Sequence, residues 1–418
     1  MRVLITTDAF PPNCGGSGWS TYELVRGLID KGHEAFVIQP SFEGRGLTVR
    51  KFDGISVAEY RARAPRIPYL RNYFKNERFY RHFADYLEGW LSETPVDVVH
   101  AQHLLTGPPS ITAARARGLP VVCTVRDYWP ICYWTDLLHD EQSVGVCPEC
   151  TQTMMSRCIR PRAGATWPLA LPFVPYMKSN LEQKRKSLAL ASAVVAVSQS
   201  VAERLRDRAP EMYQTRLEII PNPVDSERLL DEASSLERPF NKPYVLYLGK
   251  LAPNKGVREL IPVMEKSRVP WPLVVVGDGT ERDLLERQSR LSNCHVEFTG
   301  WLNRPEAIRW LYNASILVFP SRWPEPLSRV LLEASALGVP IAAMDTGGSR
   351  DIVVDRKTGL LSQTSDGLAQ AVACLYKDEQ LRQSLAGAAK RRVASRFSTA
   401  NVVGQIEALY KNLIGKKR

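Results

Sequence analysis

Short apolar runs alternate with amphipathic helical patterns along almost the whole chain. The runs of the first half span residues 2–6, 35–39, 97–101, 120–125, 193–197 and 217–220, and those of the second half span residues 244–248, 273–276, 295–298, 316–319 and 340–343. Short apolar runs separated by helices are typical of buried parallel strands. The pattern therefore predicts an α/β protein with two Rossmann-like, doubly wound domains that face each other across a cleft.

The regular alternation lapses between Pro221 and Pro243. We therefore expect one domain over residues 1–225 and a second over residues 241–397. A last helical pattern covers Thr399–Leu413, within residues 398–418.

Composition narrows the class of protein. Of the 418 residues, 44% are hydrophobic and 24% are charged, which is typical of a folded soluble protein. The apolar stretches are shorter than a membrane span, and the start MRVLITT lacks the apolar segment of a signal peptide. These features predict a cytoplasmic protein.

The net charge of +11 is unevenly distributed, because seven lysines or arginines lie between Arg61 and Arg81 against the single acid Glu77. Five aromatic residues are interleaved with them. This stretch predicts peripheral contact with an anionic membrane, at its inner face, and the alternative is a solvated helix. A nucleic-acid module is not expected, since no recognised motif accompanies the charge.

Four of the eight cysteines cluster, and the central pair forms a Cys-Pro-Glu-Cys motif. In a reducing compartment such a cluster favours a structural zinc site over disulfides, with four unligated thiols as the alternative. The residues of this cluster are Cys132, Cys147, Cys150 and Cys158.

Three glycine-rich loops directly follow predicted strands: Pro11–Gly18, Gly249–Gly256 and Val276–Gly279. Glycines let backbone amides approach an anion at the start of a helix. Lys250 and Lys255 in the second loop suit a pyrophosphate. The first loop is not a Walker A motif, since no Gly-Lys-Ser/Thr follows, and the next strand lacks the acid that binds a ribose in dinucleotide-binding proteins.

Two acids, Glu325 and Glu333, lie eight residues apart in the stretch PEPLSRVLLEASALG. Pro326 favours an extended Glu325, so a helix is expected to begin near Leu327–Ser328 with free amides at its positive end. Eight helical residues rise about 12 Å, which is comparable to the span from ribose to sugar in a nucleotide sugar.

Taken in their order along the chain, these and further segments resemble the retaining glycosyltransferases of family 4, which have the GT-B fold. The resemblance implies that residues 398–418 return to the first domain as a C-terminal helix. The resemblance covers nearly the whole chain, and the combination of GKLxxxKG with two glutamates separated by seven residues is its most specific part. The matching segments are TTDAFPPNCGGSG, DVVHAQH, VSQSVAERL, IIPNPVD, GKLAPNKG, VVGDGTE, FTGWL, FPSRWPEPLSRVLLEASALGVPIAA and GGSRD.

The resemblance implies how a nucleotide-sugar donor is bound. Lys250 and Lys255 would grip the diphosphate, Glu333 the ribose hydroxyls, and Glu325 the hydroxyls of the transferred sugar. Further donor contacts would come from the loops and the helix start, namely from Gly15, Gly16, Gly249, Gly277, Leu327, Ser328, Arg329 and Val330.

The activity that the resemblance implies is metal-independent transfer of a hexose, with retention, to a glycan or lipid-linked acceptor in the synthesis of cell-envelope polysaccharides or glycoconjugates. Retention is expected through a same-face ion-pair route, because no acid is placed as a covalent nucleophile. The alternatives are a GT-B sugar-nucleotide epimerase and a nucleotide-sugar-binding protein without activity.

The chain departs from the family pattern at three places. Arg126-Asp127 stands where many relatives have a histidine before the aspartate, and Arg126 cannot titrate near neutral pH, although it can bind phosphate or an anionic acceptor. Lys250 replaces the commoner arginine of the phosphate loop. The usual Phe-Gly-Leu after the first glutamate is Leu-Ser-Arg, which leaves the donor sugar open.

The acceptor side is expected in the first domain, around the cysteine-rich insertion at residues 127–177. His103, at the end of a predicted strand, and the aromatic rings of Trp129 and Tyr133 are the candidate acceptor contacts, since aromatic rings near a sugar site often stack on pyranoses. Burial in the core is the alternative for both aromatic rings.

Overall fold

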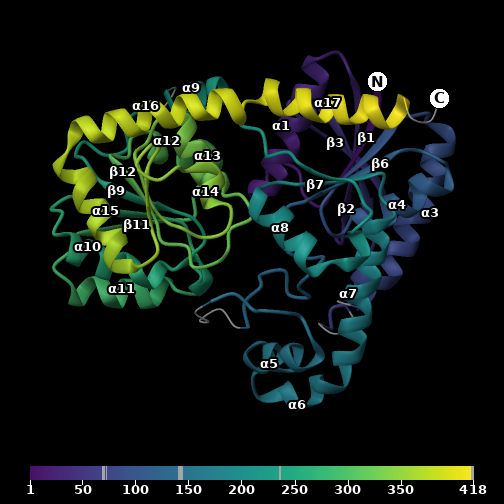
Figure 1. The fold of residues 1–418 in the computed structure, drawn as a ribbon, viewed down its shortest axis with the longest axis horizontal. Coiled ribbons are helices and arrows are strands. Elements are labelled where there is room, and N and C mark those ends of the chain that lie inside the picture. The colour runs from purple at the N-terminus through teal and green to yellow at the C-terminus, as the bar shows by residue number, and fades with distance from the viewer. Residues whose placement is uncertain (68–70, 72, 140–144, 235–236, 416–418) are drawn as a thin grey trace. The chain divides into compact units, whose positions relative to one another are not determined.

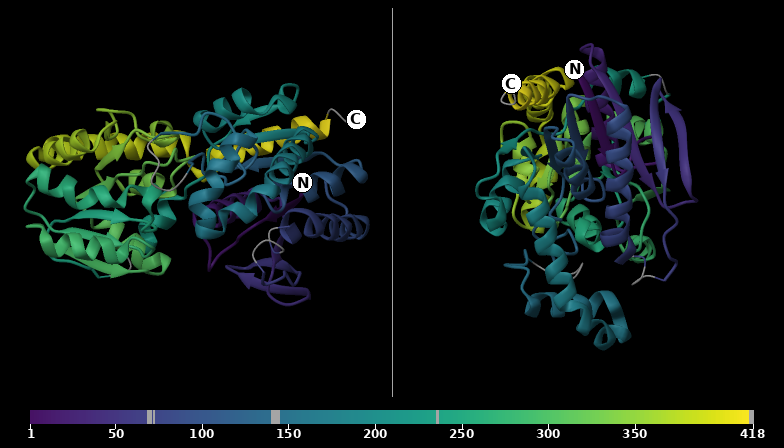
Figure 2. Two further views of the ribbon diagram at one scale, coloured as in Figure 1. Left: turned by 90° about the horizontal axis from the view of Figure 1, so that it is seen from below. Right: turned by 90° about the vertical axis from the view of Figure 1, so that its right-hand side faces the viewer.

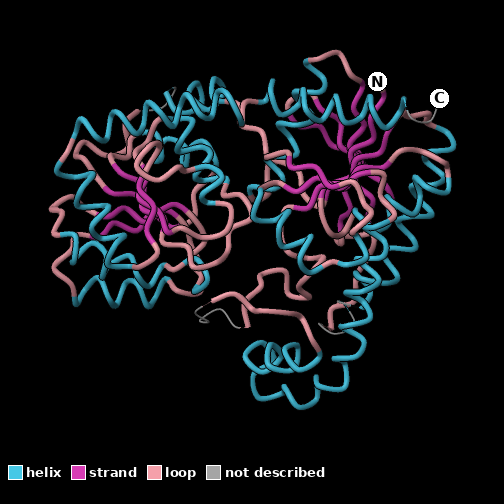
Figure 3. The backbone as a smooth tube through the Cα atoms, viewed as in Figure 1, coloured by secondary structure: helices cyan, strands magenta, loops and turns pink. Residues whose placement is uncertain are grey.

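The computed structural model describes residues 1–67, 71, 73–139, 145–234 and 237–415, and the stretch 61–81 is therefore described only in part. The chain divides into two compact α/β units, each described by itself below. The first unit holds residues 1–135, 149–223 and 399–418, and the second holds residues 136–148 and 224–398. Figure 3 shows the strands of each unit gathered into a central sheet with helices around it.

The first unit is built on an eight-stranded sheet of order β3-β4-β2-β1-β5-β6-β7-β8, in which every neighbouring pair except β3–β4 is parallel. Its strands are β1 (Arg2–Thr7), β2 (Glu34–Ser41), β3 (Gly46–Phe52), β4 (Ile55–Arg61), β5 (Val98–Gln102), β6 (Val121–Val125), β7 (Ala193–Ala196) and β8 (Leu217–Ile219). Its helices are α1 (Gly16–Asp30), the π-helix η1 (Phe74–Arg78), α3 (Phe79–Glu93), α4 (Gly107–Ala116), α5 (Gln152–Ala163), α6 (Trp167–Ala170), α7 (Val174–Ala189), α8 (Gln199–Arg208) and α17 (Thr399–Gly415).

The second unit is built on a six-stranded parallel sheet of order β11-β10-β9-β12-β13-β14. Its strands are β9 (Val245–Leu248), β10 (Leu273–Val276), β11 (Val296–Gly300), β12 (Ile316–Phe319), β13 (Ile341–Met344) and β14 (Leu360–Ser362). Its helices are α9 (Ser226–Ser234), α10 (Leu260–Ser267), α11 (Arg282–Leu291), α12 (Arg304–Tyr312), α13 (Arg329–Leu337), α14 (Ser349–Ile352), α15 (Ser365–Lys377) and α16 (Glu379–Arg396).

The central strands are mostly apolar because helices cover both faces of each sheet. β5, β6 and β10 are buried at every position, as expected for doubly wound sheets. The last helix, α17, packs on α1 of the first unit, and a Cβ atom at Gly27 would lie 2.6 Å from Thr399 Cγ2 (Figure 1). Two doubly wound Rossmann-like sheets are therefore confirmed.

The β3–β4 hairpin is a feature that the apolar runs did not indicate. It forms the edge of the first sheet, where Leu47 and Val49 are exposed (Figure 2). Its turn is Asp53-Gly54, and both residues have positive φ, at 49° and 77°. An Asp-Gly pair between alternating strands is a hairpin signal in the sequence.

Of the helices that the structure describes, none has both the length and the apolar character needed to cross a membrane.

Candidate active site

Two glycine loops of the second unit are hydrogen-bonded to each other where β9 and β10 end. The amide of Gly249 donates to Val276 O at 3.0 Å, and that of Leu251 donates to Asp278 O at 2.9 Å. Gly277 has φ 138°, and a Cβ atom there would lie 1.9 Å from Gly249 O. Only glycine fits this approach, so the close loop pair depends on the residue type that the sequence places there.

Lys255 and Glu325 form an ion pair at the same edge of the sheet. Lys255 Nζ lies 2.6 Å from Glu325 Oε1 and 4.4 Å from the centre of the Trp323 ring. Ser321 Oγ donates to the same carboxylate oxygen at 2.8 Å, and Glu325 is buried. The carboxylate is thus held in place by an ammonium and a hydroxyl, each from a loop that follows a strand.

The loops that carry this pair are packed backbone to backbone. Gly256 has φ 67°, and a Cβ atom there would lie 1.9 Å from Pro320 O. The amides of Arg322 and Trp323 both donate to Asn254 O, at 3.1 and 2.9 Å. The lysine loop after β9 and the acidic segment after β12 therefore form one structure.

Glu333 lies inside α13, which begins after its N-cap residue Ser328 as the sequence predicts. Its carboxylate is buried, and Oε1 accepts hydrogen bonds from Arg304 at 2.7 Å and from Arg329 at 2.8 Å. Burial raises the pKa of Glu333, but the two guanidiniums outweigh it and lower the pKa below its ordinary value. The carboxylate is therefore charged at neutral pH.

The second unit thus brings the predicted donor segments to one edge of its sheet, while their roles stay predictions. Sequence reasoning missed Ser321 and Arg304, which bond the two acids, and Trp323, whose ring lies against Lys255. Trp323 Nε1 also donates to Asp136 O at 2.8 Å. Arg304 is the first residue of a helix that begins after FTGWLN, so its position could be read from the sequence but its partner could not.

In the first unit, α1 begins after Gly15, which offers no side chain as a cap. The amides of Gly18 and Trp19 donate to Gly15 O, so those of Gly16 and Ser17 come before the first hydrogen bonds of the helix. A Cβ atom at Gly15 would meet nothing within 4 Å. The helix start therefore leaves the two amides of Gly16 and Ser17 outside its own hydrogen-bond pattern, and the binding of an anion there stays a prediction.

The loop after β5 carries His103 with φ 109°, a conformation that residues with a Cβ rarely adopt. Asp8 stabilises this loop by accepting hydrogen bonds from the amides of Leu105 at 2.9 Å and Thr106 at 3.1 Å. Asp8 was not among the predicted site residues. Its carboxylate bonds the backbone two and three residues beyond His103 and so holds the loop that carries this residue.

His103 is paired with Asp127, across a distance of 3.0 Å from Nε2 to Oδ2. Its other nitrogen, Nδ1, is buried and makes no hydrogen bond to any described residue. Burial lowers the pKa of His103, but Asp127 and, less strongly, Asp8 raise it above its ordinary value, against a small opposing effect of Arg126. The imidazole of His103 is therefore a titratable group beside Asp127 in the first unit.

Arg126 itself is tied into the first unit. Its Nε donates to Asn222 Oδ1 at 2.9 Å, its Nη1 donates to Thr21 Oγ1 at 3.3 Å, and the side chain is buried. Trp129 is 1% exposed, which matches the core alternative for this ring, whereas Tyr133 is partly exposed.

The cysteine cluster gives no support to a zinc site. Cys132 and Cys150 are hydrogen-bonded, and Cys158 lies near enough to raise the pKa of Cys150. Across the described parts of the chain, no three or more His, Cys, Asp or Glu side chains are arranged to hold a metal ion.

Two Rossmann-like sheets, each with glycine loops at the ends of its strands, are the architecture of the GT-B glycosyltransferases. Sucrose-phosphate synthase from Thermosynechococcus elongatus matches this fold with a TM-score of 0.75 over 100% of both chains, at 19% identity. The chain belongs to Glycosyltransferase Family 4, whose model matches residues 14–228, and the model of the glycosyl transferases group 1 matches residues 231–392.

Two relatives illustrate the range of the family. A glycogen synthase of Mycobacterium tuberculosis is 31% identical over 49% of this chain, and the match spans only about half of that protein, 51%. A GDP-mannose-dependent alpha-mannosyltransferase of Mycolicibacterium smegmatis is 28% identical over 100% of this chain and 99% of its own length.

Proposed function

We propose that the protein is a retaining glycosyltransferase that transfers a hexose from a nucleoside-diphosphate sugar to a glycan or lipid-linked acceptor. The observation that carries this proposal is the Lys255–Glu325 pair, held by Ser321 at the edge where the loops after β9, β10 and β12 meet. A cation for the leaving phosphate beside a carboxylate for sugar hydroxyls is what this reaction requires. The relatives that use nucleotide sugars support the same assignment.

The donor would be held at both ends in the second unit. Lys250 and Lys255 would contact the diphosphate, and the amides at the start of α13 would add to the positive potential there. Arg304 and Arg329 both occupy Oε1 of Glu333, which leaves Oε2 for the ribose hydroxyls. Arg329 stands where relatives have an apolar residue, and we propose that it fixes the orientation of this carboxylate.

Departure of the nucleoside diphosphate develops negative charge on the phosphate and positive character at the anomeric carbon. The lysines stabilise the first, and Glu325 keeps the sugar oriented through its hydroxyls. The acceptor attacks on the same face, and the leaving phosphate takes up the acceptor proton. No metal is assigned to this step.

On the acceptor side we assign a role to His103 in place of Arg126. With its Nε2–H donated to Asp127, neutral His103 presents the Nδ1 lone pair, which can accept a hydrogen bond from the acceptor hydroxyl. Asp127 would act as a positioning residue, since it sets the tautomer of the ring. Arg126, bonded to Asn222, would stabilise the loop that carries Asp127.

We also propose that the protein works at the cytoplasmic face of an anionic membrane in polysaccharide or glycoconjugate synthesis. The basic residues of the stretch 61–81 support this location, although Arg61 is paired with Glu59 and Lys75 lies 4.3 Å from the centre of the Phe42 ring. Cosedimentation with vesicles containing anionic lipid should weaken as salt is added, and binding that is absent or insensitive to salt would contradict it.

A panel of nucleotide sugars labelled in the sugar tests the function. We expect at least one donor to give a glycoside with retained anomeric configuration in the presence of acceptor. Conversion of the donor to an epimer would support the epimerase alternative, and binding without turnover would support a non-catalytic protein.

A further inference from the structure

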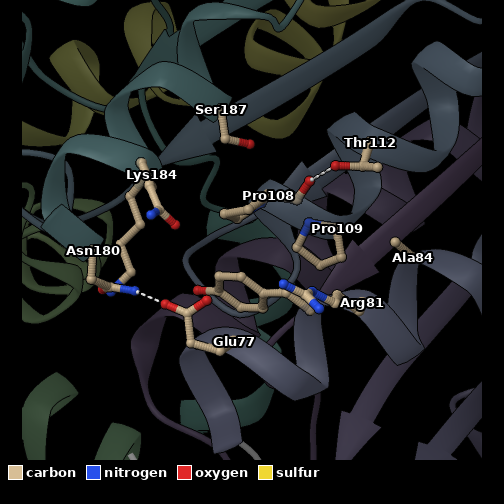
Figure 4. Close-up of a pocket in the computed structure, with 11 residues that line it drawn as sticks. Glu77, Arg81, Ala84, Pro108, Pro109, Thr112, Asn180, Lys184 and Ser187 are labelled. Carbon is tan, nitrogen blue, oxygen red and sulfur yellow. Dashed lines mark hydrogen bonds between the residues drawn. The ribbon is translucent and has the colours of Figure 1, made fainter. Parts of the chain in front are cut away.

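A cavity of about 260 Å³ lies in the first unit between α3, α4 and α7, outside the donor loops described above. Figure 4 shows the side chains around it: Glu77 and Arg81 come from η1 and α3, Pro109 from the start of α4, and Asn180 and Lys184 from α7. The wall of the cavity therefore combines apolar groups with polar side chains, two of which are cationic.

Lys184 is a buried cation at this cavity. It is 5% exposed, and with the described residues it forms neither a hydrogen bond nor an ion pair. Its Nζ instead lies 5.6 Å from the centre of the Tyr133 ring, which is a cation–π contact. A buried ammonium group without a hydrogen-bonded counter-ion is unfavourable, so a ligand with negative charge would be stabilised here.

The nearest carboxylate is already engaged. Glu77 Oε1 accepts hydrogen bonds from Asn180 Nδ2 at 2.9 Å and from the Tyr176 hydroxyl at 3.3 Å. Burial lowers the pKa of Lys184 to about 8, and the opposing effects of Glu77 and Asp127 do not restore its ordinary value. The site thus has positive charge that the protein neutralises only in part.

Arg81 adds a second set of donors to the same cavity. Its guanidinium is exposed and forms no hydrogen bond or ion pair with the described residues. An arginine fork matches two oxygens of a phosphate or carboxylate, and the lysine supplies a point charge. This combination is suited to an oxyanion and would be unusual for a neutral sugar alone.

The cavity is connected to the loop that carries His103. Tyr80, which lines the cavity, donates its hydroxyl to Leu104 O at 3.1 Å. Leu104 is the neighbour of His103, so a ligand in this cavity lies beside the loop to which we assign the acceptor hydroxyl. The acceptor is therefore the substrate that could reach both places.

We propose that this cavity binds an anionic group of the acceptor, a phosphate or a carboxylate, through Lys184 and Arg81. The proposal rests on the proposed function for the identity of the acceptor, but not for the binding of the anion. The enzyme would then favour an acceptor that carries such a group near the hydroxyl that receives the sugar.

The first test uses inorganic phosphate and the full-length protein. The rate at which Lys184 is acylated, followed by peptide mass spectrometry across a pH series, reports the protonation of its amine. We expect phosphate to slow this acylation and to move its midpoint to higher pH, since a bound anion favours the ammonium form. Lys178 of the same helix, which is paired with Glu182 at 3.7 Å, serves as the control and should not respond.

In the variant Arg81→Met, the phosphate concentration needed to slow the acylation of Lys184 should be about tenfold to a hundredfold higher. This is the usual effect of removing a charge-assisted hydrogen bond. Acylation of Lys184 that is the same with and without phosphate would overturn the proposal. So would an undiminished effect of phosphate in Arg81→Met. Because phosphate is also expected at the donor lysines, protection is read only at Lys184.

The second test compares acceptors that carry a phosphate, a carboxylate or neither group. We expect Lys184→Met to raise the acceptor KM for the charged acceptors by about tenfold or more, with Lys178→Met as the matched control. An equal effect on neutral acceptors would overturn the proposal. If no donor supports transfer, the proposed function fails while the phosphate experiment still decides the binding site.

Discussion

The Nε2 atom of His103 lies 3.0 Å from Oδ2 of Asp127, and Nδ1 of the same ring has no hydrogen-bond partner among the described residues. The two residues come from the loops after β5 and β6. Arg126, the neighbour of Asp127 in the sequence, is bonded to Asn222. The titratable partner of Asp127 therefore comes from the loop after β5 and not from the adjacent position 126.

The pH dependence of the reaction tests this assignment. The groups that face His103 are Asp127 and Asp8, which raise its pKa, and Arg126, which lowers it. If the neutral ring is needed, kcat/KM should fall as pH decreases through a pKa above the ordinary value of about 6.5. Asp127→Asn removes the main cause of the increase, so the acidic limb should move to lower pH. His103→Gln should abolish this limb.

The exposed His295→Gln is the matched control and should keep the profile of the unmodified protein. Donor affinity, measured separately by calorimetry, should stay the same in both first-unit variants. A limb that does not move in Asp127→Asn would show that another group titrates.

The Lys255–Glu325 pair predicts that each partner is needed for turnover. Lys255→Met removes a cation from the leaving phosphate, and we expect kcat to fall by about a hundredfold or more, as when one transition-state donor is lost. Glu325→Gln keeps the shape of the side chain but removes its charge, and should reduce kcat similarly. Labelled-donor assays measure both, with the surface variant Lys266→Met as the control. Turnover close to that of the unmodified protein in either variant would refute the site.

Much of the fold follows from the sequence because buried parallel strands are mostly apolar on both faces, and β10 (LVVV) shows this pattern directly. The β3 strand was missed because it lies at an edge, where only one face needs apolar residues and Val49 is exposed. The turn Asp53-Gly54 was the signal available for it.

The site was predictable where chemistry and backbone shape are encoded together, as at Gly256 and Lys255. It was not predictable where the function of one residue depends on a distant one. Glu333 is bonded by Arg304 from α12, and the loop of His103 is held by hydrogen bonds to Asp8, which follows β1. Such pairs are properties of the folded chain, and spacing in the sequence does not reveal them.

The arginines around Glu333 predict a stability that depends on pH. The pKa of Glu333 is lowered in the folded protein, so its contribution to stability is present above the unfolded pKa and is lost as pH falls through the folded value. Arg304→Met should therefore decrease the free energy of unfolding by about 1–3 kcal/mol at neutral pH. The difference should narrow at acidic pH, as the carboxyl of the variant binds a proton before that of the unmodified protein does.

Urea unfolding at several pH values measures this difference, provided that both proteins unfold in one transition. Arg290→Met, on the exposed side of α11, is a control in which an arginine is removed without loss of a buried partner. A decrease for Arg304→Met that is the same at every pH would indicate lost packing and not lost charge.

Gly256 predicts how sensitive the donor loops are to a single methyl group. Its φ is 67°, and a Cβ added there would lie 1.9 Å from Pro320 O, so alanine is strained and also clashes with backbone. We expect Gly256→Ala to lower the free energy of unfolding by more than about 2 kcal/mol and to raise the donor KM, since the loop that carries Lys255 must move away from Glu325.

Gly89 of α3 is the opposite case, because a Cβ there meets nothing within 4 Å and alanine favours a helix. Gly89→Ala should raise the free energy of unfolding by up to about 1 kcal/mol. If the two variants changed the free energy of unfolding alike, the clash with Pro320 would not be the cause of the change in Gly256→Ala.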